Sequence, residues 1–215
     1  MSLLLPKIKG NNPRLGIMGG TFDPLHLGHL VTAEEARTNF CLESVIFVPA
    51  GIPAHKKDQR ITDPEHRYLM TFLAVMNNPY FSISRVEIDN VIPSYTIDTV
   101  RFFFQTYGSK AQIFFITGAD AIQEIATWKD YQELLETCTF IAASRTGYSF
   151  EKLKETVEPH YPQIYEQVHF MEIPAMAISS TSIRQRVKEG RTIKYLIPDP
   201  VEQYIYKNRL YRDDE

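Results

Sequence analysis

Cysteine is scarce in this chain, and its two copies are far apart. Among the 215 residues, Cys41 and Cys138 are the only cysteines, and neither belongs to a CxxC pair. A disulfide scaffold and a cysteine-ligated zinc site are therefore not supported as organising features. We expect two reduced, partly buried thiols.

The chain also lacks a strong excess of charge and any long hydrophobic run. Its formal net charge is -3 at pH 7, so no global basic field can grip nucleic acid, and anion recognition must come from a local cluster of donors. The leucine run at 3–5 ends at Pro6 and is too short for a signal-peptide core or a membrane span. We expect a cytoplasmic protein with small-molecule partners, no nucleic acid and no membrane, and a homo-oligomer is left open.

What the sequence does contain is a regular alternation of short apolar runs with stretches of helical spacing. The strand-like runs are residues 15–18, 45–48, 81–86, 113–116, 140–143 and 168–171, and the helix-like stretches are 30–39, 64–76, 97–107, 131–136, 182–188 and 199–209. Such alternation predicts an α/β fold, namely a Rossmann-like, doubly wound, mostly parallel sheet with helices on both faces. We expect a single domain over 1–215 with a small C-terminal helical extension over about 180–215.

Two Asp-Pro pairs, Asp23-Pro24 and Asp63-Pro64, each predict a helix N-cap followed by proline in the first turn. In doubly wound sheets, ligands bind beyond the carboxyl ends of the strands. The residues that follow each predicted strand are therefore the first candidates for a functional site.

The segment after the first predicted strand combines glycines, a turn and two histidines in the order Gly19-Gly20-Thr21-Phe22-Asp23-Pro24-Leu25-His26-Leu27-Gly28-His29. Adjacent glycines allow close approach of a ligand, and the following helix start offers N–H groups that suit phosphate. The segment matches neither the GxGxxG nor the P-loop pattern. His26 and His29 can present their rings to one ligand. The alternative is that both rings only pack at the turn. A zinc site is less favoured, because no third His or Cys ligand lies at a familiar spacing. Together with the glycines, the histidines favour phosphate binding.

A second polar segment follows the last predicted strand and opens a helix, with the order Ile178-Ser179-Ser180-Thr181-Ser182-Ile183-Arg184. Hydroxyl groups at a helix start can simply cap free backbone N–H groups. The planar guanidinium of Arg184 is suited to bidentate contact with phosphate. Taken alone, the segment leaves capping and phosphate binding open.

The two segments together resemble the paired signatures of the nucleotidylyltransferase superfamily. The resemblance implies that His26 and His29 hold ATP phosphates and stabilise charge on the transferred phosphoryl group, that Asp23 shapes the turn, and that Arg184 neutralises pyrophosphate. The run Gly118-Ala119-Asp120-Ala121 is similar to the family's adenosine-contacting turn, in which Gly118 would admit the ribose and Asp120 would bond its hydroxyls. The implied ATP-binding residues are Gly19, Gly20, Thr21, Phe22, Gly118, Asp120, Ile178, Ser179, Ser180 and Thr181.

Three internal segments resemble those of bacterial nicotinic acid mononucleotide adenylyltransferases. They are Val48-Pro49 with Pro53-Ala54-His55-Lys56, then Ser94-Tyr95-Thr96-Ile97-Asp98-Thr99, and finally Trp128, which is followed by Lys129 where relatives often carry an aromatic residue. Lys56 would reach the phosphates, the helix start at Ser94, Tyr95 and Thr96 would bind the nicotinate carboxylate, and Trp128 would stack on the pyridinium ring.

The resemblance therefore implies transfer of AMP from ATP to nicotinic acid mononucleotide, giving nicotinic acid adenine dinucleotide and pyrophosphate in NAD biosynthesis. His26, His29, Lys56 and Arg184 would neutralise charge together with Mg²⁺, which would be bound through ATP phosphates and not through protein side chains. Nicotinamide mononucleotide and phosphopantetheine remain alternative acceptors. A non-catalytic nucleotide-binding regulator remains the alternative from another functional class.

Overall fold

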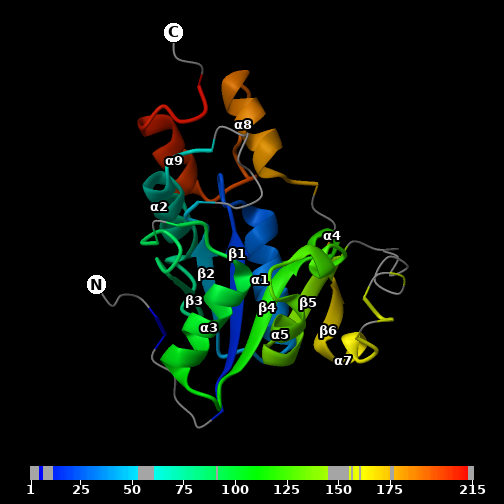
Figure 1. The fold of residues 1–215 in the computed structure, drawn as a ribbon. Helices are drawn as coiled ribbons and strands as arrows, with labels where there is room; N and C mark the ends of the chain where they lie inside the picture. Colours follow the sequence, from blue (N-terminus) through cyan, green and yellow to red (C-terminus); the bar gives the residue numbers. More distant parts are fainter. Residues whose placement is uncertain are drawn as a thin grey trace.

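The chain folds around one six-stranded sheet with helices on both faces (Figure 1). The computed structural model describes residues 5–6, 12–52, 61–90, 92–144, 155, 157–159, 161–174 and 177–212. Its strands are β1 (Arg14–Gly20), β2 (Ser44–Pro49), β3 (Phe81–Ile83), β4 (Gln112–Gly118), β5 (Thr139–Ser144) and β6 (Val168–Glu172). The strand order is β3-β2-β1-β4-β5-β6, and all five neighbouring pairs are parallel. The predicted fold class is confirmed.

The strand order places the point where the winding direction reverses between β1 and β4. From β1 the chain proceeds outward through β2 to β3, and it then returns to β4 on the other side of β1 before reaching β5 and β6. Ligands of doubly wound sheets bind in the crevice beyond the carboxyl ends of the strands at this point. Gly20 and Gly118, the last residues of β1 and β4, mark that position in this fold.

Helices cover the two sheet faces unequally. The helices are α1 (Leu27–Asn39), α2 (Pro64–Val75), α3 (Thr96–Tyr107), α4 (Ala119–Ile122), the 3₁₀ helix η1 (Ile125–Thr127), α5 (Tyr131–Thr137), α7 (Ile164–Gln167), α8 (Ser180–Lys188) and α9 (Asp199–Lys207). Because side chains alternate along a strand, Ile17 packs with α3 and α5 on one face while Met18 packs with α1 and α2 on the other. Both side chains are almost fully buried.

The C-terminal helices α8 and α9 pack against α2 through a third apolar cluster. Met70 of α2 meets Ile183 of α8 and Val201 of α9 there, and all three are fully buried. The Leu27 N–H donates to the carbonyl oxygen of Leu196 at 3.0 Å, which ties the first turn of α1 to the same region. The polar segment that opens α8 is therefore held close to the loop that follows β1.

Two local predictions are wrong. The strand predicted over 81–86 ends at Ile83, because the Ser84 hydroxyl accepts from the Val86 N–H at 3.3 Å and turns the chain out of the ladder. Asp23 does not cap a helix, since α1 begins at Leu27 with His26 as its N-cap. Asp63 caps α2 as predicted by accepting from the Glu65 N–H at 2.8 Å.

The cysteines are free, but Cys41 is exposed and Cys138 is buried, so the expected partial burial of both is wrong. The backbone of Cys41 lies outside the helix, in the turn between α1 and β2. Among the described residues, none of the helices has the length and apolar character that a membrane crossing requires.

Candidate active site

The loop after β1 is anchored by a buried arginine that sequence reasoning missed. Arg67 of α2 is 1% exposed, and its guanidinium donates to the carbonyl oxygens of Thr21, Gly51 and Thr62, each at 2.8 Å. Burial lowers the pKa of Arg67, an effect that the charge of Asp23 opposes. One side chain thus fixes the relative position of the chain after β1, the chain after β2 and the approach to α2.

Asp23 is the second anchor, and it holds the C-terminal segment to the loop after β1. Its carboxylate accepts from the Tyr211 hydroxyl at 2.7 Å and from the Thr62 N–H at 3.2 Å. Its backbone oxygen accepts from Arg184 Nη1 at 2.7 Å. Asp23 therefore organises its surroundings and brings Arg184 of α8 to the end of β1.

His26 and His29 lie against each other at the start of α1. Their ring centroids are 3.7 Å apart and the ring planes are 25° from parallel. The backbone N–H of His26 donates to Nδ1 of His29 at 3.2 Å. Burial lowers the pKa of His26 to about 4, and burial together with the neighbouring His26 lowers the pKa of His29 to about 3.

Both rings are therefore neutral at pH 7 in the ligand-free protein. A neutral imidazole that accepts at Nδ1 carries its proton at Nε2, so Nε2 of His29 is a hydrogen-bond donor. The spacing between the histidines is also explained, because a Cβ atom at Gly28 would lie 3.0 Å from Nδ1 of His26. Gly28 leaves the space in which the His26 ring sits.

The two glycines at the end of β1 make room for aromatic rings. A Cβ at Gly20 would lie 2.8 Å from the ring of Phe22, and one at Gly19 would lie 3.1 Å from the ring of Phe115. Phe22 is buried, and its ring meets His29 edge-on with centroids 5.2 Å apart. Packing of Phe22 against His29 therefore accounts for Gly20, and packing of Phe115 accounts for Gly19, in addition to any access that the glycines give a ligand.

Two cavities open at the carboxyl ends of β1 and β4. The smaller, of about 250 Å³, is lined by His26, His29, Gly118 and Ile178, among others. The larger, of about 480 Å³, holds seven predicted residues on its wall: Gly19, Gly20, Thr21, Ser94, Tyr95, Thr96 and Trp128. Thr117 lines both cavities, so the two cavities adjoin each other.

The chain matches the family described as cytidylyltransferase-like over residues 17–186. It is 57% identical over 200 residues to a protein of Moorella thermoacetica named "Probable nicotinate-nucleotide adenylyltransferase", covering 93% of this chain and 92% of the relative. A protein of the same name from Thermoanaerobacter sp. is 53% identical over 202 residues, covering 94% and 96%. This chain belongs to the nicotinate-nucleotide adenylyltransferase family. The resemblance that the sequence motifs carry is confirmed.

A solved structure shares the fold of this family member. The Plasmodium falciparum nicotinic acid mononucleotide adenylyltransferase complexed with APC superposes with a TM-score of 0.72 at 20% identity, covering 93% of this chain and 98% of that one. At this identity the likeness concerns the fold alone.

Not all of the residues predicted from the family signatures reach the two cavities. Thr181 and Arg184 line a separate cavity of about 590 Å³ beside α8. Two of the predicted hydroxyls are engaged within the protein: Ser179 caps α8 by accepting from the Ser182 N–H at 3.1 Å, and Ser180 donates to the Pro24 carbonyl at 2.8 Å. Asp120 is exposed. Lys56, with Pro53, Ala54 and His55, lies outside the described residues.

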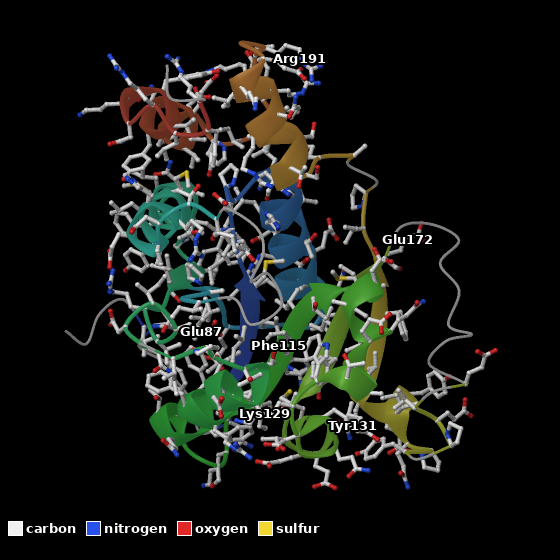
Figure 2. All side chains as sticks on the ribbon, turned by 45° about the horizontal axis from the view of Figure 1, so that its top comes forward. Glu87, Phe115, Lys129, Tyr131, Glu172 and Arg191 are labelled. Atoms are coloured by element: carbon white, nitrogen blue, oxygen red, sulfur yellow. The ribbon has the colours of Figure 1, made fainter. Side chains whose placement is uncertain are left out.

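The wall of the larger cavity also includes a partly buried acid that sequence reasoning missed. Glu87 accepts from the Thr99 hydroxyl at 2.6 Å, and burial raises its pKa to about 7. Figure 2 shows Glu87, Phe115 and Lys129 at this part of the molecule. Nothing in the local sequence distinguishes Glu87 from a surface acid, because its burial depends on residues distant in the chain.

Proposed function

We propose that this protein transfers AMP from ATP to the phosphate of nicotinic acid mononucleotide and releases pyrophosphate. An oxygen of the acceptor phosphate attacks the α-phosphorus of ATP, and the bond between that phosphorus and the pyrophosphate oxygen breaks. The acceptor phosphate is largely dianionic at neutral pH because its second pKa is near 6. It therefore needs no protein base, and catalysis consists of positioning the two substrates and stabilising charge.

The observation that carries the proposal is the geometry of the histidine pair. His29 donates through Nε2, because its Nδ1 is occupied by the backbone N–H of His26. The pair faces the smaller cavity next to Gly118, where the ATP phosphates would lie. Donors held in place in this way stabilise the charge that develops on the transferred phosphoryl group.

The remaining predicted ATP contacts are assigned by their place around the loop after β1 and the start of α8. Gly118 and Ile178 share the smaller cavity with the histidines, and we assign adenosine and phosphate contacts to them. Arg184 would neutralise the leaving pyrophosphate once its guanidinium shifts from the Asp23 carbonyl, and Lys56 would add a second cation. Thr21, Ser179, Ser180 and Thr181 would contribute hydroxyl or backbone groups along the phosphates, and Asp120 would contact the ribose.

Mg²⁺ would enter with ATP. Histidine N–H and guanidinium donors bind phosphate oxygens and do not ligate a cation. Among the residues that the structure describes, no group of three or more His, Cys, Asp or Glu side chains is arranged to hold a metal ion. We therefore assign Mg²⁺ to the ATP phosphates, where it would neutralise part of their charge.

The larger cavity is the proposed site of the acceptor. Trp128 lies at its wall and packs edge-on against Phe115, with ring centroids 6.2 Å apart. Its ring is partly buried and would stack on the pyridinium ring of the acceptor. Tyr95 and Thr96 begin α3 at the same wall, so the positive end of that helix dipole faces the cavity. This combination suits a cationic ring that carries a carboxylate.

The test is pyrophosphate release with ATP, Mg²⁺ and nicotinic acid mononucleotide, comparing the wild-type protein with His29→Ala and His169→Ala. We expect His29→Ala to lower kcat by about 10²- to 10³-fold, the usual effect of deleting one donor to a developing charge. His169 lies exposed on β6, so its replacement should leave kcat unchanged. A His29→Ala protein with wild-type kcat would contradict the assigned role. ATP binding without pyrophosphate release by the wild-type protein would instead favour the regulator.

A further inference from the structure

A lysine lies at the rim of the proposed acceptor cavity, directly after Trp128. Lys129 contributes to the cavity wall together with Tyr95 and Thr96. Its ammonium nitrogen lies over the Tyr95 ring, 4.7 Å from the centroid. The cation therefore stands beside the first residues of α3, so two positive features meet at one edge of the cavity.

This ammonium is held only loosely by other side chains. Among the described residues it pairs with Asp98, at 3.5 Å from Oδ2, and the two side chains are 43% and 40% exposed. Exposed pairs of this kind contribute little to stability. A ligand carboxylate can therefore compete for the ammonium.

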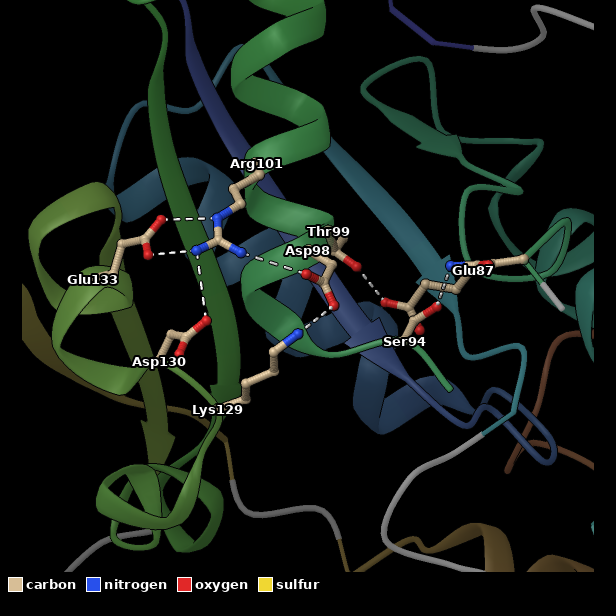
Figure 3. Close-up of polar contacts among 9 residues, drawn as sticks. Glu87, Ser94, Asp98, Thr99, Arg101, Lys129, Asp130 and Glu133 are labelled. Atoms are coloured by element: carbon tan, nitrogen blue, oxygen red, sulfur yellow. Dashed lines mark hydrogen bonds and ion pairs between the residues drawn. The ribbon is translucent and has the colours of Figure 1, made fainter. Parts of the chain in front are cut away.

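The arginine next to this pair is shared among three carboxylates, as Figure 3 shows. Arg101 donates two hydrogen bonds to Glu133, at 2.8 and 2.5 Å, and it is also 3.5 Å from Asp130. It also pairs with Asp98 at 3.6 Å, a separation similar to the 3.5 Å between Asp98 and Lys129. The two cations therefore share Asp98, and Lys129 is the one of the two that lines the cavity.

We propose that Lys129 is a specificity-determining residue whose ammonium binds the ring carboxylate of the acceptor and favours the acid over the uncharged amide. The proposal rests on the proposed function. It assigns Lys129 two effects: direct attraction to the carboxylate, and a share, together with Arg101, in neutralising Asp98, whose charge would otherwise repel that carboxylate. The carboxylate is remote from the reacting phosphate, so both effects act equally on bound substrate and transition state and are expected in KM.

The experiment measures kcat/KM with nicotinic acid mononucleotide and with nicotinamide mononucleotide for the wild-type protein, Lys129→Met, Lys129→Arg and Lys110→Met. We expect Lys129→Met to lower the acid-to-amide preference about three- to fivefold, as loss of a partly exposed charge pair does, through a higher KM for the acid. Lys129→Arg keeps the charge and should keep the preference within about twofold. Lys110 lies exposed in the turn before β4, so Lys110→Met is the matched control and should not change the preference.

A double variant separates charge from shape. If Asp98 repels the acid once Lys129 is gone, Asp98→Asn combined with Lys129→Met should recover part of the lost preference. The wild-type preference should also weaken at high ionic strength, because exposed charges are screened.

An unchanged preference in Lys129→Met would overturn the proposal. The proposal would also be overturned if Lys129→Arg lowered the acid-to-amide preference as much as Lys129→Met does, or if Lys129→Met lowered kcat/KM equally for both acceptors. Either result would indicate that Lys129 acts through packing. A wild-type protein that does not use nicotinic acid mononucleotide would instead overturn the proposed function on which the inference rests. The two failures are therefore distinguishable within one set of assays.

Discussion

Replacing Arg67 with methionine removes the guanidinium that joins three loops while keeping a long apolar side chain in its place. The wild-type side chain makes three hydrogen bonds of 2.8 Å, to the carbonyl oxygens of Thr21, Gly51 and Thr62. Methionine donates none of them. The three carbonyls are left to water or to no partner.

The magnitude follows from the count of bonds and the cost of burial. A hydrogen bond from a charged donor contributes about 1.5–3 kcal/mol, so three lost bonds amount to roughly 4.5–9 kcal/mol. Relief of the several kcal/mol that a buried cation costs offsets part of this loss. We expect Arg67→Met to lower the free energy of unfolding by about 3 kcal/mol.

Urea unfolding at pH 7 measures this difference through the transition midpoint and the slope. Arg191→Met is the matched control, because Arg191 is 53% exposed and pairs with Glu189 on the surface, so its loss should cost less than about 0.5 kcal/mol. Arg67→Lys keeps the charge but not the planar fork, so an intermediate loss is expected. A loss below about 1 kcal/mol in Arg67→Met would show that the guanidinium does not hold the three loops together, because three buried bonds could not be so weak.

Two further predictions concern the histidine pair and the partly buried acid. Gly28→Ala would place a Cβ 3.0 Å from Nδ1 of His26, so kcat/KM should fall about tenfold because the His26 ring is displaced. Urea unfolding should show no loss of stability, since alanine favours a helix. A kcat/KM equal to that of the wild type would contradict the role assigned to Gly28. Burial raises the pKa of Glu87 to about 7, whereas the carboxyl of the unfolded chain titrates near 4.5. The contribution of Glu87 to the free energy of unfolding is therefore full below about pH 4.5 and is lost as the pH rises to about 7. Glu87→Gln should therefore be more stable than wild type by about 2 kcal/mol at pH 8 and not at pH 4, and a difference that does not vary with pH would rule this out.

The framework of the fold could be predicted because it depends on local patterns. Buried parallel strands give continuous apolar runs, such as 45–48 in β2, and helical spacing marks the stretch that became α2. The capping role of Asp63 is also local, since its partner is two residues away. These features depend on a few neighbouring residues and can be recognised without tertiary structure.

The remainder depends on contacts between distant segments. Asp23 has the same Asp-Pro context as Asp63, yet its carboxylate bonds Tyr211, 188 residues away, and so does not cap α1. The role of Arg67 depends likewise on carbonyls after β1 and β2. Motif resemblance located His26 and His29, but only the structure shows that their rings stack and that Nδ1 of His29 is occupied.

The proposed activity and its acceptor are both tested by pyrophosphate release from ATP and Mg²⁺ with three acceptors in parallel: nicotinic acid mononucleotide, nicotinamide mononucleotide and phosphopantetheine. We expect the highest kcat/KM with nicotinic acid mononucleotide and a product with the mass of nicotinic acid adenine dinucleotide. A higher kcat/KM with either other acceptor would contradict the assignment of the acceptor cavity, and no release with any of the three would contradict the proposed activity.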